Sequence, residues 1–198
     1  MMSRQAKMVT QADIIPFEQY SKNRKQLRKE IIEFKKNRRI SLGPYATFYF
    51  ECYETMLAQI QEMLYIEKGG NNQLNDELKA YNPLIPKGKE LIATLMFEID
   101  NALIRLEFLN KVGGIEEKVF IKINGETINS FPEKDIDRTS SEGKASSVQF
   151  IHFNFTEEQI KKFKDFSNDV ILGINHDTYK HAIKIPEFTR KALIKDFS

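Results

Sequence analysis

Residues 53–64, YETMLAQIQEML, and residues 81–86, YNPLIP, together predict how the first half of the chain folds. In the first stretch the apolar side chains recur at spacings of three and four residues, which places them on one face of an α-helix. They are Tyr53, Met56, Leu57, Ile60, Met63 and Leu64. In the second stretch two prolines restrict the backbone, because the residue before a proline is kept out of the helical region. We therefore expect a core-facing helix over 53–64, a shorter helix over 74–81, and an extended corner over 82–86.

Amide and carboxylate side chains gather beside that helix and the corner after it. With about 100° of rotation per residue, Gln61 lies on a flank of the apolar face and Glu62 points away from it. A buried glutamine needs hydrogen-bond partners, and backbone groups freed by the proline corner are suitable. We expect Gln59, Gln61 and Glu62 to form a structural network there, and Gln61, Glu62 and Asn82 are the candidates for binding a ligand. An exposed helix surface and a ligand-binding site are the alternatives.

Positive charge is concentrated at the N-terminal end of the chain. Residues 1–44 contain 11 Lys and Arg against 4 Asp and Glu, although the net charge of the whole chain is +2. Within Lys22–Arg39, the residues Leu27, Ile31 and Phe34 form one narrow apolar stripe, which predicts a basic amphipathic helix. Such a helix binds nucleic acid or an anionic membrane surface, or it packs its stripe on the protein body. The packing role is favoured, because no aromatic residues are interleaved with the basic ones for base stacking.

The second half of the chain mixes strands with helices. An Asn124-Gly125 pair between two apolar runs predicts a β-hairpin, and Thr156 begins a capping box that opens a helix. Strands are expected over 45–50, 90–99, 119–123, 127–128, 148–155 and 169–175, and further helices over 101–112 and from Pro186.

The order of these elements predicts the fold class. Helices crowd the first half, and strands and helices mix in the second, so we expect an α+β fold in which a helical N-terminal half packs on a largely antiparallel β-sheet with flanking helices. The chain is expected to form a single domain over 1–198, with a helical part of about 1–88 and a mixed part of about 89–198. The polar residues 129–146 predict a loop that is either disordered or a lid.

No familiar catalytic signature occurs in the sequence. A phosphate loop, a nucleophile triad, a dinucleotide fingerprint and a cysteine metal site are all missing, so whether the protein is an enzyme stays open. Cys52 is the single cysteine and cannot form an internal disulfide, which favours a reducing compartment. Because no signal peptide or membrane span is present either, we expect a cytoplasmic protein without membrane contact.

The segment 175–181, NHDTYKH, is the best site candidate of the second half. His176 and His181 are five residues apart, so they can share a divalent metal ion only if the chain bends between them. A carboxylate would complete a two-histidine, one-carboxylate site, and the candidates are Glu62, Glu54 and Asp177. Tyr179, between the histidines, is a further ligand-binding candidate. The alternative is that the histidines cap a strand end or bond locally.

Five stretches spread over nearly the whole chain carry a family resemblance. They are QIQEML at 59–64, YNPLIP at 81–86, LIATLMFE at 91–98, SSVQFIHF at 146–153 and GINHDTYKH at 173–181. These stretches resemble an uncharacterised bacterial family known as domain of unknown function 3501. The resemblance implies no established activity, fold or ligand. Its members are often encoded near rubrerythrin-like and iron–sulfur oxidoreductase proteins, which suggests redox or peroxide physiology.

Three functions are compatible with these observations. The first is a non-catalytic accessory or interaction protein that docks a redox protein partner, as the proteins encoded near the family members suggest. The second is a small metal-binding protein or metalloenzyme that uses His176, His181 and a carboxylate. The third is a nucleic-acid-binding protein that acts through Lys22–Arg39. The first function is favoured.

Overall fold

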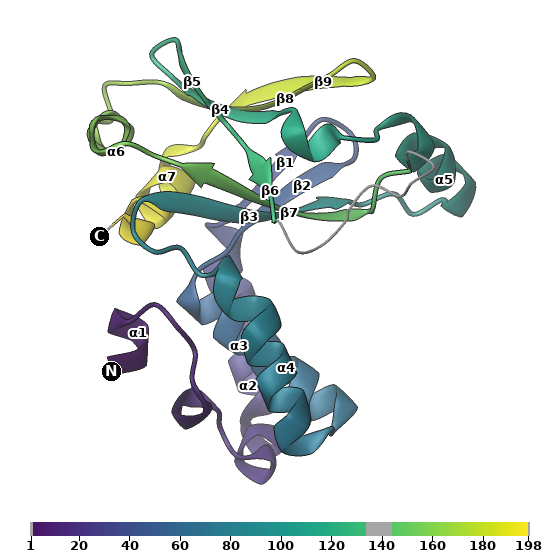
Figure 1. Cartoon of the computed structure of the whole chain (residues 1–198), viewed down its shortest axis with the longest axis vertical. Coiled ribbons are helices and arrows are strands. Elements are labelled where there is room, and N and C mark those ends of the chain that lie inside the picture. The colour runs from purple at the N-terminus through teal and green to yellow at the C-terminus, as the bar shows by residue number, and fades with distance from the viewer. Residues whose placement is uncertain (1, 134–143, 198) are drawn as a thin grey trace.

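The computed structural model describes residues 2–133 and 144–197 and has the α+β architecture that the sequence predicts (Figure 1). All strand pairs in two β-sheets are antiparallel within the described ranges. In Figure 1 the two sheets lie in the upper part of the molecule, and helices α2, α3 and α4 form a helical layer below them. The helices α6 and α7 lie at one end of the sheets and α5 lies at the other.

The first sheet has the strand order β1-β2-β3-β7-β6. Its strands are β1 Arg39–Leu42, β2 Ala46–Phe50, β3 Glu90–Phe97, β7 Val148–Asn154 and β6 Phe131–Pro132. The second sheet has the order β5-β4-β8-β9. Its strands are β5 Glu126–Asn129, β4 Val119–Ile123, β8 Val170–His176 and β9 Tyr179–Lys184.

The helical layer comprises α2 Phe17–Lys36, α3 Tyr53–Glu67 and α4 Gly70–Tyr81. The remaining helices are α1 Met2–Gln5, α5 Ala102–Lys111, α6 Glu157–Lys164 and α7 Glu187–Leu193. Short 3₁₀ turns occur at Gln11–Asp13, Asn82–Leu84, Ile115–Glu117 and Ile194–Asp196. None of the helices in the described part of the chain combines the length and the apolar character needed to cross a membrane.

Two apolar clusters hold these layers together. The larger cluster lies between the two sheets and includes Phe48 and Phe153 from the first sheet and Leu172 from the second. The smaller cluster joins the helical layer to the first sheet through Ile60 of α3 and Ile92 of β3. All five side chains are at most 1% exposed, and burying each of them stabilises the fold by roughly 1.5–3 kcal/mol.

The predicted helix over 53–64 is confirmed as α3, which continues to Glu67. Met56 and Ile60 on its apolar face are buried in the smaller cluster. The helix ends at Lys68, which adopts the left-handed conformation with φ of 56°. That conformation is usual for the residue after a helix but is most often taken by glycine.

Several details differ from the sequence prediction. The basic helix ends at Lys36, and Arg39–Leu42 form strand β1, because Ile40 and Leu42 alternate with exposed neighbours and reach the core. Strands β1 and β2 therefore place part of the N-terminal half inside the first sheet. The proline corner is a 3₁₀ turn, closed by a bond from the Ile85 amide to the Asn82 carbonyl, and is not extended.

Two segments of the second half also differ from prediction. Strand β9, which pairs with β8 along its full length, was not predicted. The predicted loop over 129–146 contains β6, which pairs with β7. Residues 134–143 of that loop lie outside the described residues.

His152 of β7, which pairs with β3 on one side and β6 on the other, lies between two carboxylates. Its Nε2 is 2.8 Å from Glu133 Oε2 and its Nδ1 is 3.4 Å from Glu90 Oε2. The imidazole is 7% exposed and stacks on the ring of Phe131 in β6. Burial by itself would lower the pKa of His152, but the two carboxylates outweigh burial and raise the pKa above its ordinary value.

We expect His152 to make the stability of the protein depend on pH. Because its folded-state pKa exceeds the unfolded value near 6.5, its stabilising contribution is complete below about pH 6.5 and is lost as the pH rises through the folded value. Urea unfolding at about pH 6 and about pH 8.5 should show a larger loss of stability for the natural chain than for His152→Gln. An equal pH dependence in both proteins would contradict this role.

Candidate functional site

Two of the predicted site residues, Gln61 and Asn82, bind the backbone of the N-terminal arm, defined as residues 7–16. Gln61 accepts a hydrogen bond from the Ile15 amide at 2.8 Å and donates one to the Ile15 carbonyl at 3.1 Å. Asn82 pairs in the same way with Val9, at 2.7 and 3.0 Å. The predicted partner of Gln61 was wrong, because its side-chain amide binds this arm and not the proline corner. Both side chains hold the arm across α3 and the end of α4.

Changing Gln61 to methionine tests this attachment, because the two side chains have similar shapes. Gln61 is 5% exposed, so Gln61→Met should leave the Ile15 amide and carbonyl unpaired and lower the free energy of unfolding by roughly 1–3 kcal/mol. Hydrogen exchange at the Ile15 amide should become faster. The matched control is Gln59→Met, which removes only a 3.4 Å contact with the Tyr81 hydroxyl and should change little. Equal losses of stability in the two variants would show that Gln61 does not hold the N-terminal arm.

Glu62 joins α3 to α2. It accepts two hydrogen bonds from Arg24, both of 2.9 Å, and a third from the Tyr20 hydroxyl at 2.6 Å. The bonds from Arg24 lower the pKa of Glu62 most, and the bond from Tyr20 lowers it further against the effect of burial. The carboxylate is therefore charged at neutral pH and holds the Arg24 side chain in one position.

Tyr179 fastens the second sheet to the turn between β1 and β2. Its buried hydroxyl donates a hydrogen bond to the Leu42 carbonyl at 2.6 Å and accepts bonds from the Tyr45 and Ala46 amides at 3.1 and 3.0 Å. The ring of His181 packs against Tyr179, with centroids 4.5 Å apart. Tyr179 thus has a structural role in this turn.

The two predicted metal ligands do not meet a carboxylate. His176 contacts Thr178 Oγ1 at 2.9 Å and the Gly113 carbonyl at 3.3 Å, and His181 lies opposite Ile174 in the β8–β9 pair. Strands β8 and β9 lie in the upper part of Figure 1, whereas α3, which carries Glu62, lies in the lower part. Within residues 2–133 and 144–197, no group of three His, Cys, Asp or Glu side chains is placed to hold a metal ion. The structure therefore keeps these two histidines apart from Glu62.

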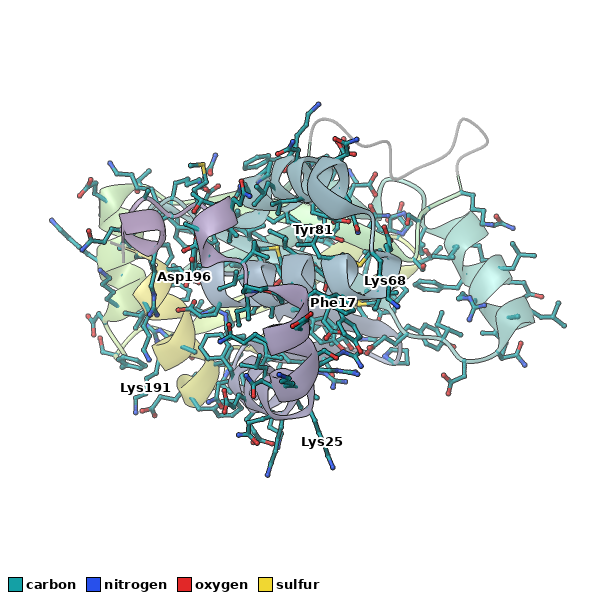
Figure 2. The ribbon with its side chains drawn as sticks, turned by 90° about the horizontal axis from the view of Figure 1, so that it is seen from below. Phe17, Lys25, Lys68, Tyr81, Lys191 and Asp196 are labelled. Carbon is teal, nitrogen blue, oxygen red and sulfur yellow. The ribbon has the colours of Figure 1, made fainter. Side chains whose placement is uncertain are left out.

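A different group of side chains does come together, on the outer side of α2 and the end of α3. We call it the basic–aromatic face and define it as Phe17, Arg24, Lys25, Arg28, Lys29, Tyr65 and Lys68. Figure 2 looks at this end of the molecule from below and shows Phe17 near Lys68, with Lys25 projecting from α2 at the lower edge.

Ring contacts link the cations of this face to its aromatic residues. The rings of Phe17 and Tyr65 are stacked, with centroids 5.2 Å apart and planes inclined by 15°. The Arg24 guanidinium lies 4.5 Å from the centre of the Tyr65 ring, and the Lys68 ammonium lies 5.7 Å from the centre of the Phe17 ring. Both distances are within the range of cation–π attraction. Cations and rings therefore alternate on one surface.

Two hollows meet at Tyr65. The basic hollow has a volume of about 480 Å³ and is lined by Arg24, Lys25, Arg28, Lys29 and Tyr65, together with Ser21, Ile32 and Glu33, of which Glu33 pairs with Lys36 outside the hollow. The aromatic hollow has a volume of about 500 Å³, and its lining includes Phe17, Tyr20, Leu64, Tyr65 and Lys68. A ligand that spans both hollows would meet positive charge on one side of Tyr65 and apolar surface on the other.

The charge of the basic hollow is largely uncompensated. Arg24 is paired with Glu62, but in the described part of the chain Lys25, Arg28 and Lys29 form no ion pair with a carboxylate. All three side chains are exposed. The sequence revealed these cations but not their aromatic neighbours, because Tyr65 comes from α3 and no spacing along the chain relates it to α2.

Comparison with known proteins identifies relatives without an assigned function. A family model described as "Protein of unknown function (DUF3501)" matches residues 8–197, which confirms the resemblance seen in the sequence. The crystal structure of a novel protein of unknown function from Burkholderia pseudomallei K96243 is similar to this chain, with 31% sequence identity and a TM-score of 0.89. The match covers 96% of this chain and 100% of that one. No curated protein matches.

Proposed function

The chain belongs to the DUF3501 family of proteins of unknown function, and from this premise we propose that it is a non-catalytic protein that binds nucleic acid through the basic–aromatic face. The single observation that supports this most is the contact of Arg24 and Lys68 with two stacked aromatic rings. Basic side chains bind the phosphates of a nucleic acid, and aromatic side chains offer a surface for its bases.

A non-catalytic role is supported by how the other candidate residues are used. The polar groups of Gln61 and Asn82 bind the N-terminal arm, and the Tyr179 hydroxyl binds the turn after β1. Glu62 positions Arg24 beside Tyr65. These four side chains therefore shape the fold and the basic–aromatic face and do not form a reaction centre of their own.

The link to redox physiology stays a prediction that depends on the resemblance. Cys52 is the single cysteine of the chain and is buried at the start of α3. Burial raises the pKa of its thiol to about 12, although Arg38 acts in the opposite direction. The thiol is therefore protonated at neutral pH and is a poor nucleophile. A redox partner would have to supply the redox chemistry itself.

Charge reversal of the basic hollow tests the proposed function. The natural chain should bind a fluorescent oligonucleotide, and its affinity should fall roughly 20- to 150-fold between about 50 and 200 mM salt if three or four cations contact phosphates. A variant with Lys25→Glu, Arg28→Glu and Lys29→Glu should lose most of this binding and most of the salt dependence. Fluorescence anisotropy measures both quantities.

The matched control reverses three exposed lysines of the second sheet, Lys122, Lys180 and Lys184, and makes the same change in net charge. This control should keep most of the binding, because its substitutions lie outside the basic–aromatic face. An affinity that does not depend on salt, or an equal loss in the two triple variants, would refute binding at this face.

A further inference from the structure

We infer that the basic–aromatic face selects single-stranded nucleic acid, with a base stacked at Phe17 in the aromatic hollow and backbone phosphates in the basic hollow. This inference rests on the proposed function and names the form of nucleic acid that the face accepts. The positive charge of the face does not by itself imply this selectivity, because a surface that bound only phosphates would accept a duplex equally well.

The partial exposure of the Phe17 ring supports the binding of a single strand. Phe17 is 48% exposed although it is stacked on Tyr65, so part of its ring is open to a ligand. In a duplex the bases are stacked on each other and their faces are covered, whereas the unpaired bases of a single strand can stack on a protein side chain. Tyr65 lines both hollows, so a base at Phe17 would have its neighbouring phosphates beside Arg24 and Lys25.

Lys68, directly after α3, adds a cation to this surface. Lys68 ends α3 in the left-handed conformation, which costs roughly 1 kcal/mol for a residue with a Cβ atom, and a glycine follows it directly. In this position the Lys68 ammonium lies over the Phe17 ring, 5.7 Å from its centre. Lys68 thus supplies a cation next to the proposed stacking position.

An anionic membrane surface fits this face less well. A helix that binds lipid inserts its apolar stripe into the headgroup region. Two of the three residues of the α2 stripe, Leu27 and Ile31, are half-buried against the body of the protein, and only Phe34 at its end is exposed, at 40%. The rings of Phe17 and Tyr65 are stacked on each other and are not part of that stripe.

A tryptophan at position 17 provides a direct test, because the chain contains no tryptophan. In Phe17→Trp the fluorescence should be quenched when an unstructured oligonucleotide is added, since a stacked base quenches indole emission. The same oligonucleotide annealed to its complement should cause little quenching. The matched control is Phe188→Trp on α7, where the natural side chain is 56% exposed and lies outside the face. Its fluorescence should not respond.

Removal of the aromatic ring at position 17 tests how much base stacking contributes to the affinity. Phe17→Ala should weaken single-strand binding about tenfold, as expected for the loss of one stacking contact. The salt dependence should not change, because no charge is removed. Phe188→Ala should bind normally, and Phe17→Tyr should restore affinity because it restores the ring. Thermal unfolding of each variant shows whether it is folded, and Phe17→Tyr provides a conservative variant if Phe17→Ala is unstable.

The outcomes separate this inference from the proposed function. Equal binding of single strands and duplexes, with no quenching in Phe17→Trp, would overturn the single-strand inference and leave nucleic-acid binding intact. Binding to vesicles of anionic lipid without binding to any oligonucleotide would overturn both. Parallel titrations with RNA and DNA strands of one sequence show which of the two nucleic acids binds more tightly. For either nucleic acid, tighter binding of the single strand than of the duplex supports the inference.

Discussion

Replacing Arg38 with methionine is expected to lower the free energy of unfolding by roughly 3–5 kcal/mol, because it leaves a buried carboxylate without its partner. The Arg38 side chain is 4% exposed and lies where the end of α2 meets the C-terminal helix. It donates hydrogen bonds to the carbonyls of Phe50, Glu51 and Ala192 and to the carboxylate of Asp196, at 2.9, 3.0, 3.3 and 2.5 Å.

Chemical denaturation with urea measures this effect, and the adjacent arginine supplies the control. Arg39 has a side chain that is 51% exposed and lies 3.7 Å from Glu98, so Arg39→Met should change stability by no more than about 0.5 kcal/mol. Arg38→Lys should be intermediate, because lysine keeps the charge but cannot donate to four acceptors in the arrangement of a guanidinium. Similar losses for Arg38→Met and Arg39→Met would show that the buried network contributes little.

Gly43→Ala is expected to destabilise the protein by roughly 2–4 kcal/mol. Gly43 has a φ of +65°, a conformation that a residue with a Cβ atom adopts at a cost. A Cβ atom there would lie 2.6 Å from His181 Cδ2 and 2.7 Å from the Tyr179 hydroxyl. The added methyl group would therefore displace the hydroxyl that binds the Leu42 carbonyl.

Gly125→Ala separates the two contributions to this loss. Gly125 has a φ of +86°, and a Cβ atom at that position would meet nothing within 4 Å. This control therefore carries the backbone cost alone, roughly 1–2 kcal/mol. The extra loss in Gly43→Ala reports the contact with Tyr179 and His181. Equal midpoints of urea unfolding in the two variants would show that the turn after β1 adapts to a methyl group.

Features encoded over a few residues were predictable from the sequence. The apolar spacing of 53–64 gave α3, and the Asn124-Gly125 pair gave the β4–β5 hairpin. The capping box at Thr156 is present, and the backbone amide of Gln159 donates a hydrogen bond to Thr156 Oγ1 at 3.2 Å. In each case the physical cause acts within one turn or one helix, so the local sequence is sufficient.

Features that depend on a distant partner were not predictable in the same way. Strand β1 is only four residues long and is stabilised by its pairing with β2, and β9 is stabilised by its pairing with β8. The partners of Gln61 and Asn82 lie on the N-terminal arm, far away along the chain. A buried polar side chain needs a hydrogen-bond partner, but the tertiary fold determines which backbone group is that partner.

The sequence by itself determined the α+β class, the family and the row of cations on α2. Only the tertiary structure placed Phe17 and Tyr65 beside those cations and kept His176 and His181 away from Glu62. Periodicity fixes which face of its own helix or strand a side chain occupies, because that follows from backbone geometry. Which faces then meet depends on how separate elements bury their apolar surfaces together, and no spacing along one element encodes that.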